Sequence, residues 1–185
     1  MTLPVTLVVR RHSADGRDSE AVYSRCERYR YCLTRTWDAG GRRLLYIMLN
    51  PSKATERAND PTIERCERRA RQLGYGAFRV CNLFALRETD PARLRRARRP
   101  VGPDNERQLR DAVVWADDVL CAWGVHGVQA NQCAQVAGWL AECADRVLVL
   151  GLTKDGHPRH PLYLPYTARP VAWAAFTAGR WPGAS

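Results

Sequence analysis

The sequence has no long apolar run, and this absence excludes a membrane-spanning protein. No uninterrupted apolar stretch reaches the roughly 18 residues that a membrane-spanning helix requires. The start, Met1 to Pro4, has no charged region followed by an apolar stretch, as a secretory signal would have. We therefore expect a cytoplasmic protein.

Residues that ligate metals are few and poorly spaced. The chain has four histidines, of which only His157 and His160 lie close together in sequence. Its seven cysteines form no C-x-x-C pair, whereas zinc and iron–sulfur sites need clustered ligands. Their odd number and apolar surroundings indicate reduced core residues rather than disulfides. We therefore expect no metal and no cofactor.

Lysine is almost absent, although the chain is basic. Lys53 and Lys154 are the only lysines among 29 basic residues, and 19 acidic residues leave a net charge of +10. A basic chain favours a polyanionic partner, and the guanidinium group of arginine can bind phosphate with two hydrogen bonds at once. The alternative is that a GC-rich genome causes the arginine bias and that these charges only cover a solvated surface.

Apolar patterning predicts one α/β domain over residues 1–185. Residues 1–43 indicate antiparallel strands at Val5–Val9, around Val22 and at Tyr29–Trp37. In residues 44–166, apolar runs alternate with helical spacing over 63–73, 109–116 and 133–144, which is typical of parallel strands joined by crossover helices. The four runs are Leu44–Leu49, Phe78–Leu83, Val119–Trp123 and Val147–Leu150. The expected fold is therefore a central four-stranded parallel sheet with an N-terminal antiparallel extension.

Unusual residues follow all four of these runs. Ligands of open α/β sheets bind beyond the carboxyl ends of the strands, so these segments predict a site. They are Asn50-Pro51-Ser52, then Asn82-Leu83-Phe84 with Arg87-Glu88-Thr89-Asp90-Pro91, then Trp123-Gly124, and finally residues 156–163 with the run His160-Pro161-Leu162-Tyr163.

Each segment also has a purely structural interpretation. Asn50 before proline is ordinary turn chemistry, and Trp123 is equally compatible with a core position. Asp60, followed by Pro61, is expected first as a helix cap and second as a catalytic carboxylate. His160 lies between two prolines, which stiffen its loop and so help to aim the side chain.

Arginines gather in two stretches. One follows the second apolar run, where a basic segment beside a concave rim would neutralise phosphates; it contains Arg93, Arg95, Arg96, Arg98 and Arg99. The other lies on the predicted helix after Asp60 and is interrupted by acidic residues; it contains Arg65, Arg68, Arg69 and Arg71. For this helix we prefer a solvated face to a binding surface.

Several linked motifs resemble a known family. They are Tyr29-Arg30-Tyr31-Cys32-Leu33-Thr34-Arg35-Thr36-Trp37, Met48-Leu49-Asn50-Pro51-Ser52, Asp60-Pro61-Thr62, Asn82-Leu83-Phe84, Ala122-Trp123-Gly124 and His160-Pro161-Leu162-Tyr163. Together, from about Val22 to Leu164, they resemble the bacterial and phage family catalogued as domain of unknown function 1643. That family is in turn distantly similar to the uracil-DNA glycosylase superfamily. The Asn50-Pro51 pair is similar to the mismatch-specific branch, which has Asn-Pro where the uracil-specific branch has Asp-Pro.

The resemblance implies a three-layer α/β/α fold and a monomeric, monofunctional DNA glycosylase without a cofactor. Asn50 would hold a water beneath the sugar, because an amide cannot take its proton, and His160 would donate a hydrogen bond to the departing base. The base would contact Pro51, Ser52, Asn82, Phe84 and Trp123, with Phe84 preferred over Trp123 for stacking. The DNA would contact Arg87, Arg93, Arg95, Arg96 and Arg159, with Leu162 and Tyr163 filling the gap left by the flipped base.

The expected substrate is a modified base. Ser52 stands where uracil-specific enzymes have a tyrosine that excludes bulky 5-substituents, so the resemblance favours a modified pyrimidine of phage DNA, such as glucosylated hydroxymethylcytosine. The role would then be anti-phage defence. Two alternatives stay open, a non-catalytic nucleic-acid-binding module and a nucleoside or nucleotide hydrolase. The first is motivated by the lack of an evident general base among the four segments.

Overall fold

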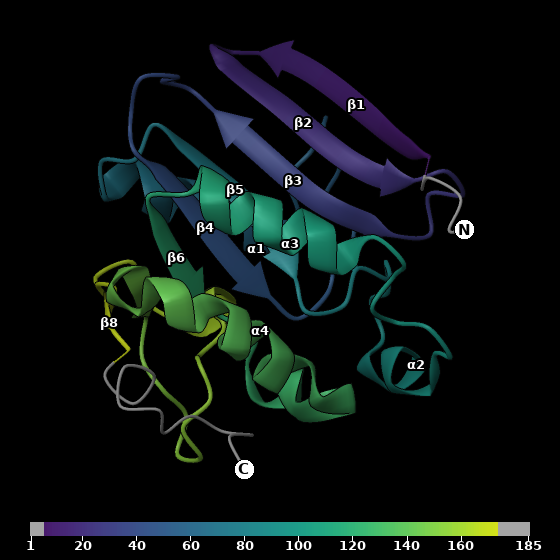
Figure 1. Cartoon of the computed structure of the whole chain (residues 1–185). Helices are drawn as coiled ribbons and strands as arrows, with labels where there is room; N and C mark the ends of the chain where they lie inside the picture. The colour runs from purple at the N-terminus through teal and green to yellow at the C-terminus, as the bar shows by residue number, and fades with distance from the viewer. Residues whose placement is uncertain (1–5, 174–185) are drawn as a thin grey trace.

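Every strand that the structure describes belongs to one mixed sheet. The computed structural model describes residues 6–173, and the strand order is β1-β2-β3-β5-β4-β6-β7-β8 (Figure 1). The strands are β1 (Leu7–Ala14), β2 (Arg17–Ser24), β3 (Arg30–Thr36), β4 (Arg43–Met48), β5 (Ala77–Asn82), β6 (Asp118–Cys121), β7 (Val147–Val149) and β8 (Val171–Ala172). The predicted α/β class is therefore confirmed.

The central strands run parallel and are covered on both faces. β4 pairs in parallel with β5 on one side and with β6 on the other, and β6 pairs in parallel with β7. Helix α1 (Pro61–Gln72) packs on one face, while α3 (Asn105–Trp115) and α4 (Gln132–Leu140) pack on the other, in front of the strands in Figure 1. Because the strand order reverses at β4, a crevice is expected beyond the carboxyl ends of β4, β5 and β6.

The sheet is larger than the expected one. β1, β2 and β3 are antiparallel, as expected for residues 1–43, and β3 also pairs antiparallel with β5, so these strands extend the central sheet. At the opposite edge, β8 pairs antiparallel with β7. The prediction did not include the pairings of β3 with β5 and of β7 with β8, because they join distant segments. Val5, the expected start of the first strand, lies outside the described residues.

Local sequence signals explain where the helices begin and end. The Asp60 carboxylate accepts a hydrogen bond from the Ile63 backbone N–H at 2.9 Å and caps α1, with Pro61 at the first helical position. α2 (Pro91–Arg96) begins in the same way after Asp90. The helix expected over residues 133–144 ends early as α4, and the chain continues in the 3-10 turn η2 (Ala141–Arg146), in which Cys143 has non-helical dihedral angles. Two further 3-10 turns are η1 (Val125–Asn131) and η3 (Pro161–Tyr163).

The described part of the chain, 6–173, contains no helix long and apolar enough to cross a membrane. All seven cysteines fall in this range as free thiols, and all but Cys26 are buried. Burial raises the pKa of the Cys66 and Cys121 thiols, whereas a hydrogen bond with the Ser24 hydroxyl lowers the pKa of Cys26. Among the seven cysteines, Cys26 is therefore the one whose thiol is both accessible and shifted toward the reactive thiolate form.

We predict that a thiol reagent labels one cysteine of the native protein rapidly and the other six only after unfolding. Cys26→Ser is the matched control and should remove the rapid phase without changing the melting temperature. Mass spectrometry of the labelled peptides identifies the site. Rapid labelling of two or more cysteines in the folded protein would contradict the described burial.

Candidate functional site

A pocket of about 460 Å³ lies where the carboxyl ends of β4, β5 and β6 meet. Residues from all four predicted segments contribute to its lining. The structure thus brings together Asn50 and Ser52, Asn82, Trp123 and Gly124, and His160 and Tyr163, and it adds Arg30, Asp60, Thr62, Glu88, Thr89 and His126. The ends of several distant segments therefore share one hollow.

Asn50 joins the segment after β4 to the segment after β5. Its side-chain Nδ2 donates to the carbonyl oxygens of Glu88 at 2.6 Å, Pro51 at 3.1 Å and Leu86 at 3.5 Å. These bonds fix the orientation of the amide. Its Oδ1 accepts no hydrogen bond from the residues that the structure describes, so this atom can accept one from a water or a ligand.

Asn82 is a buried amide without partners. It is the last residue of β5, its exposed fraction is 1%, and it lines the pocket. Neither its Nδ2 nor its Oδ1 has a hydrogen-bond partner among residues 6–173. An unpaired buried polar group costs about 1–3 kcal/mol and is rare in native proteins. A ligand that offers an acceptor and a donor side by side would satisfy both atoms.

His160 is held in one tautomer. It precedes η3, and its Nδ1 accepts a hydrogen bond from the Leu162 backbone N–H at 3.3 Å. In the neutral ring the proton then lies on Nε2, which becomes the donor. Burial lowers the pKa of His160 from its ordinary value of 6.5, and the negative charge of Asp60 opposes this shift. The imidazole is therefore neutral at pH 7.

Two arginines of α1 hold the His160 loop. Arg65 donates to the carbonyl oxygens of Leu164 at 2.7 Å and Pro161 at 3.4 Å, and Arg69 donates to Pro165 at 3.0 Å. The expectation that this helix presents a solvated face is therefore wrong for Arg65 and Arg69. Because loop carbonyls pack against the helix, the two side chains turn inward as donors. Arg68 and Arg71 lie nearer solvent, and Arg71 pairs with Glu67.

Asp60 caps α1 and also lies at the pocket. One carboxylate oxygen caps α1 and the other accepts a hydrogen bond from the Ala54 backbone N–H at 3.2 Å. The same side chain lines the pocket. The expected cap is thus confirmed, and the carboxylate also contributes negative charge to the site.

Arg30 is one of the lining residues that the sequence interpretation missed. Its exposed fraction is 2%, its Nη1 donates to the Ala54 carbonyl oxygen, and its Nε has no partner among the described residues. Burial lowers its pKa to about 10, so the guanidinium stays charged at neutral pH. The available signal was an arginine inside a strand of otherwise buried residues, because arginine is seldom fully buried unless paired.

The family described as "Protein of unknown function (DUF1643)" matches residues 30–162. The chain belongs to this family. The matched range begins at Arg30 and includes Asn50, Asn82 and His160, so the pocket lies almost wholly within it. No curated protein and no solved structure matches the chain.

The two candidate stacking residues of this DUF1643 protein have different positions. Phe84, the preferred candidate, is fully buried in the core and lies outside the pocket lining. Trp123 lines the pocket and packs edge-on against Trp173, with ring centroids 5.8 Å apart. Gly127 packs so closely on Trp123 that an added Cβ would lie 2.4 Å from its Cδ1. Contacts with Gly127 and Trp173 therefore hold the Trp123 ring in place.

Pro51 and Leu162 also lie outside the lining. Pro51 is buried, and its carbonyl oxygen accepts from the Glu88 backbone N–H at 3.1 Å, which gives it a structural role. Leu162 is half-buried. Tyr163, by contrast, lines the pocket with an exposed fraction of 80%, and its ring centroid lies 6.1 Å from that of His160.

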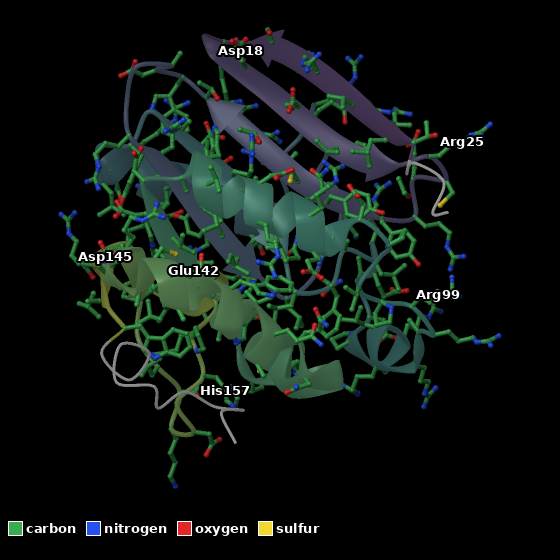
Figure 2. The ribbon with its side chains drawn as sticks, in the orientation of Figure 1. Asp18, Arg25, Arg99, Glu142, Asp145 and His157 are labelled. Carbon is green, nitrogen blue, oxygen red and sulfur yellow. The ribbon has the colours of Figure 1, made fainter. Side chains whose placement is uncertain are left out.

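A second hollow of about 740 Å³ adjoins the pocket and shares Ser52, Glu88 and Thr89 with it. Its basic side chains come from Arg28, Lys53, Arg87 and Arg93, and its other carboxylate is Glu27, which pairs with Arg10. We call this hollow the basic groove. Arg95, Arg96 and Arg159 are exposed outside it. Figure 2 shows nitrogen-tipped side chains projecting around α2, with Arg99 at this edge.

Residues 6–173 include no group of three or more histidine, cysteine, aspartate or glutamate residues placed to hold a metal ion. The charged groups that line the pocket are instead Arg30, Asp60 and Glu88, together with two histidines. The chemistry available from these side chains is hydrogen bonding, placement of a water, and stabilisation of charge.

We predict that NMR titration of the His160 ring gives a pKa below 6.5, and that Asp60→Asn lowers it further. Burial disfavours the charged imidazolium, and the variant removes the negative charge that opposes this effect. Asparagine also caps helices well, so α1 should persist and the melting temperature serves as the control. A pKa above 6.5, or one that rises in Asp60→Asn, would contradict the described environment.

Proposed function

We propose that this protein is a monofunctional DNA glycosylase that receives a flipped, modified pyrimidine in the pocket and hydrolyses its N-glycosidic bond. The observation that carries the proposal is the buried, unpartnered amide of Asn82. A pyrimidine presents a donor and an acceptor next to each other on its pairing edge, and both would be satisfied by one side-chain amide. The nearby Asn50 and His160 supply the other two functions that the reaction needs.

The size and walls of the pocket support a base with a substituent. Ligand pockets usually measure about 300–1,000 Å³, and this one measures about 460 Å³. Ser52 forms part of the wall and is small, which leaves room at one side of the ring. Trp123 offers an aromatic surface for the extruded base. A glucosylated hydroxymethylcytosine of phage DNA is the substrate we favour, with anti-phage defence as the role.

The reaction would proceed by bond cleavage ahead of water attack. The bond between the sugar C1′ and the base breaks, and both electrons leave with the base, so the sugar becomes oxocarbenium-like. Asn50 Oδ1 would orient a water toward C1′ without taking its proton. The Nε2–H of His160 would donate to a base oxygen as negative charge develops there. The water oxygen adds to C1′, and the released base takes up the proton that the water loses.

The basic groove favours a polymer substrate over a free nucleotide. It is continuous with the pocket through Ser52, Glu88 and Thr89, so the backbone phosphates beside a flipped nucleotide would meet Arg28, Lys53 and Arg93. Tyr163, exposed where it lines the pocket, is placed to fill the gap in the duplex.

The proposal includes a uracil-DNA glycosylase-like arrangement and a monomeric protein. Its support is the three-layer arrangement of α1, the sheet, and α3 with α4, together with a pocket at the point where the strand order reverses. The motif residues Asn50 and His160, from distant segments, share that pocket.

The direct test is base release from DNA. Oligonucleotides that carry uracil, hydroxymethylcytosine or glucosylated hydroxymethylcytosine are incubated with the protein and examined for alkali-labile abasic sites. We expect release of a modified pyrimidine. Asn50→Ala should keep DNA binding but lose about a hundredfold in rate, as removal of one preorganised polar group does. The melting temperature shows whether the bonds to Glu88 and Leu86 are needed for folding.

The other outcomes separate the alternatives. Tight binding of every substrate without product, with equal affinity for Asn50→Ala, would support a non-catalytic module. Release of bases from nucleosides but not from DNA would support a nucleoside hydrolase. If no substrate, including modified phage DNA, yields abasic sites, the glycosylase proposal is excluded.

We predict that Asn82→Leu raises the stability of the free protein while abolishing base release. Leucine has the same branched arrangement of side-chain heavy atoms as asparagine, and the change removes a buried amide whose lack of partners costs about 1–3 kcal/mol. Denaturant unfolding measures the stability and the abasic-site assay measures the rate. Asn105→Leu is the matched control, because its Nδ2 donates to the carbonyl oxygens of Asn82 and Leu83 and its loss should destabilise. Undiminished activity of Asn82→Leu would refute the assigned contact.

A further inference from the structure

The pocket contains a buried positive charge that the roles described above do not use. Among the described residues that line the pocket, Arg30 is the only arginine or lysine, and it forms no ion pair within the described part of the chain. Its Nη1 donates to the Ala54 carbonyl oxygen, and its buried Nε is left without a partner. A buried guanidinium in this state is suited to an anionic ligand.

A β-bulge aims Arg30 at the site. Cys32 pairs with Val22 and Arg30 pairs with Tyr23, so Tyr31 between them has no opposite residue. Tyr31 and Cys32 consequently pack in the same core cluster, although neighbours in a regular strand face opposite sides. Arg30 is thereby turned toward the pocket that Asn82 also lines, at the end of the neighbouring strand β5.

Arg30 is the cationic group among the charged side chains that line the pocket in the described part of the chain. His160 is neutral at pH 7, as argued above, and His126 is exposed. Both carboxylates of the lining accept backbone N–H groups, Asp60 from Ile63 and Ala54, and Glu88 from Thr89 and Asp90. Asp60 lies near enough to Arg30 to favour its charged form, whereas Arg87 and Arg35 disfavour it and add positive potential.

We propose that Arg30, together with the Asn82 amide, binds the pyrimidine as an anion and so stabilises the base as it leaves. The inference rests on the proposed glycosylase function and adds a catalytic residue to it. When the C1′–N bond breaks, its electron pair moves onto the ring nitrogen and oxygen of the base. The charged guanidinium compensates this negative charge and keeps its own protons. The base anion then takes the proton that the attacking water releases.

The first test measures binding rather than turnover. 5-Fluorouracil is titrated into the protein, and ultraviolet difference spectra, which distinguish the ionised from the neutral ring, are recorded as a function of pH. We expect the bound base to ionise at a lower pH than the free base, so that the wild-type protein binds the anion. Arg30→Gln should bind the anion at least about tenfold more weakly, since a charged donor is lost, and Arg30→Lys should restore part of the affinity.

Arg35→Gln is the matched control. Arg35 is a neighbouring buried arginine that binds Asn59 and the Thr55 carbonyl oxygen and does not line the pocket. Its loss removes a charge that does not contact the base, so the affinity for the anion should fall far less than in Arg30→Gln. If Arg30→Gln does not fold, Asn82→Asp decides, because a carboxylate introduced beside Arg30 should cancel the anion binding. Wild-type affinity for the anion in either Arg30→Gln or Asn82→Asp would overturn the proposal.

The second test separates this inference from the glycosylase function. Substrates whose bases are progressively poorer leaving groups are compared, and the rate of Arg30→Gln should fall more steeply along the series than that of the wild type. If the wild type releases bases and Arg30→Gln shows the same dependence, the Arg30 role is wrong while the glycosylase function stands. If the wild type releases no base, the glycosylase function fails, and the spectroscopic titration still decides whether Arg30 binds pyrimidine anions.

Discussion

A polar group that is buried without a partner destabilises a folded protein, and two such groups line the same pocket here. Among the described residues, neither the Nδ2 nor the Oδ1 of Asn82 has a hydrogen-bond partner, and the Arg30 guanidinium has no ion pair. The neighbouring buried Arg35, by contrast, binds Asn59 and backbone carbonyls. The simplest physical account is that a ligand supplies the missing partners, and that the free protein is less stable because these groups are kept for binding.

The rest of the site keeps these two groups in position. The central strand β4 places Asn50 at the reversal of strand order, and the Asn50 amide ties the neighbouring segment to it through the Glu88 carbonyl. On the opposite wall, Arg65 and Arg69 fasten the loop that carries His160 to α1. The pocket is thus assembled by side-chain bonds to backbone carbonyls, which hold loops more firmly than chain connectivity alone.

Sequence patterns anticipated the part of the site that follows from strand periodicity. Residues at or just after the ends of the apolar runs, such as Asn50, Asn82 and Trp123, could be placed at one rim because the carboxyl ends of parallel strands meet there. Arg30 could not, since its direction depends on a bulge at Tyr31 that no local signal marks. The position of Phe84 outside the pocket lining could not be predicted either, because the direction of a loop side chain depends on packing against distant segments. The pairing of β3 with β5 was hidden in the same way.

The central claim is that the unpartnered Asn82 amide pairs with the edge of a pyrimidine. The most direct measurement is a crystal structure of the protein with an oligonucleotide that carries a non-cleavable 2′-fluoro analogue of the modified pyrimidine nucleotide. The account predicts that the base lies in the pocket beside Trp123, with both Asn82 side-chain atoms hydrogen-bonded to its edge. A base that stays stacked in the DNA, or that binds elsewhere while Asn82 keeps no partner, would contradict it.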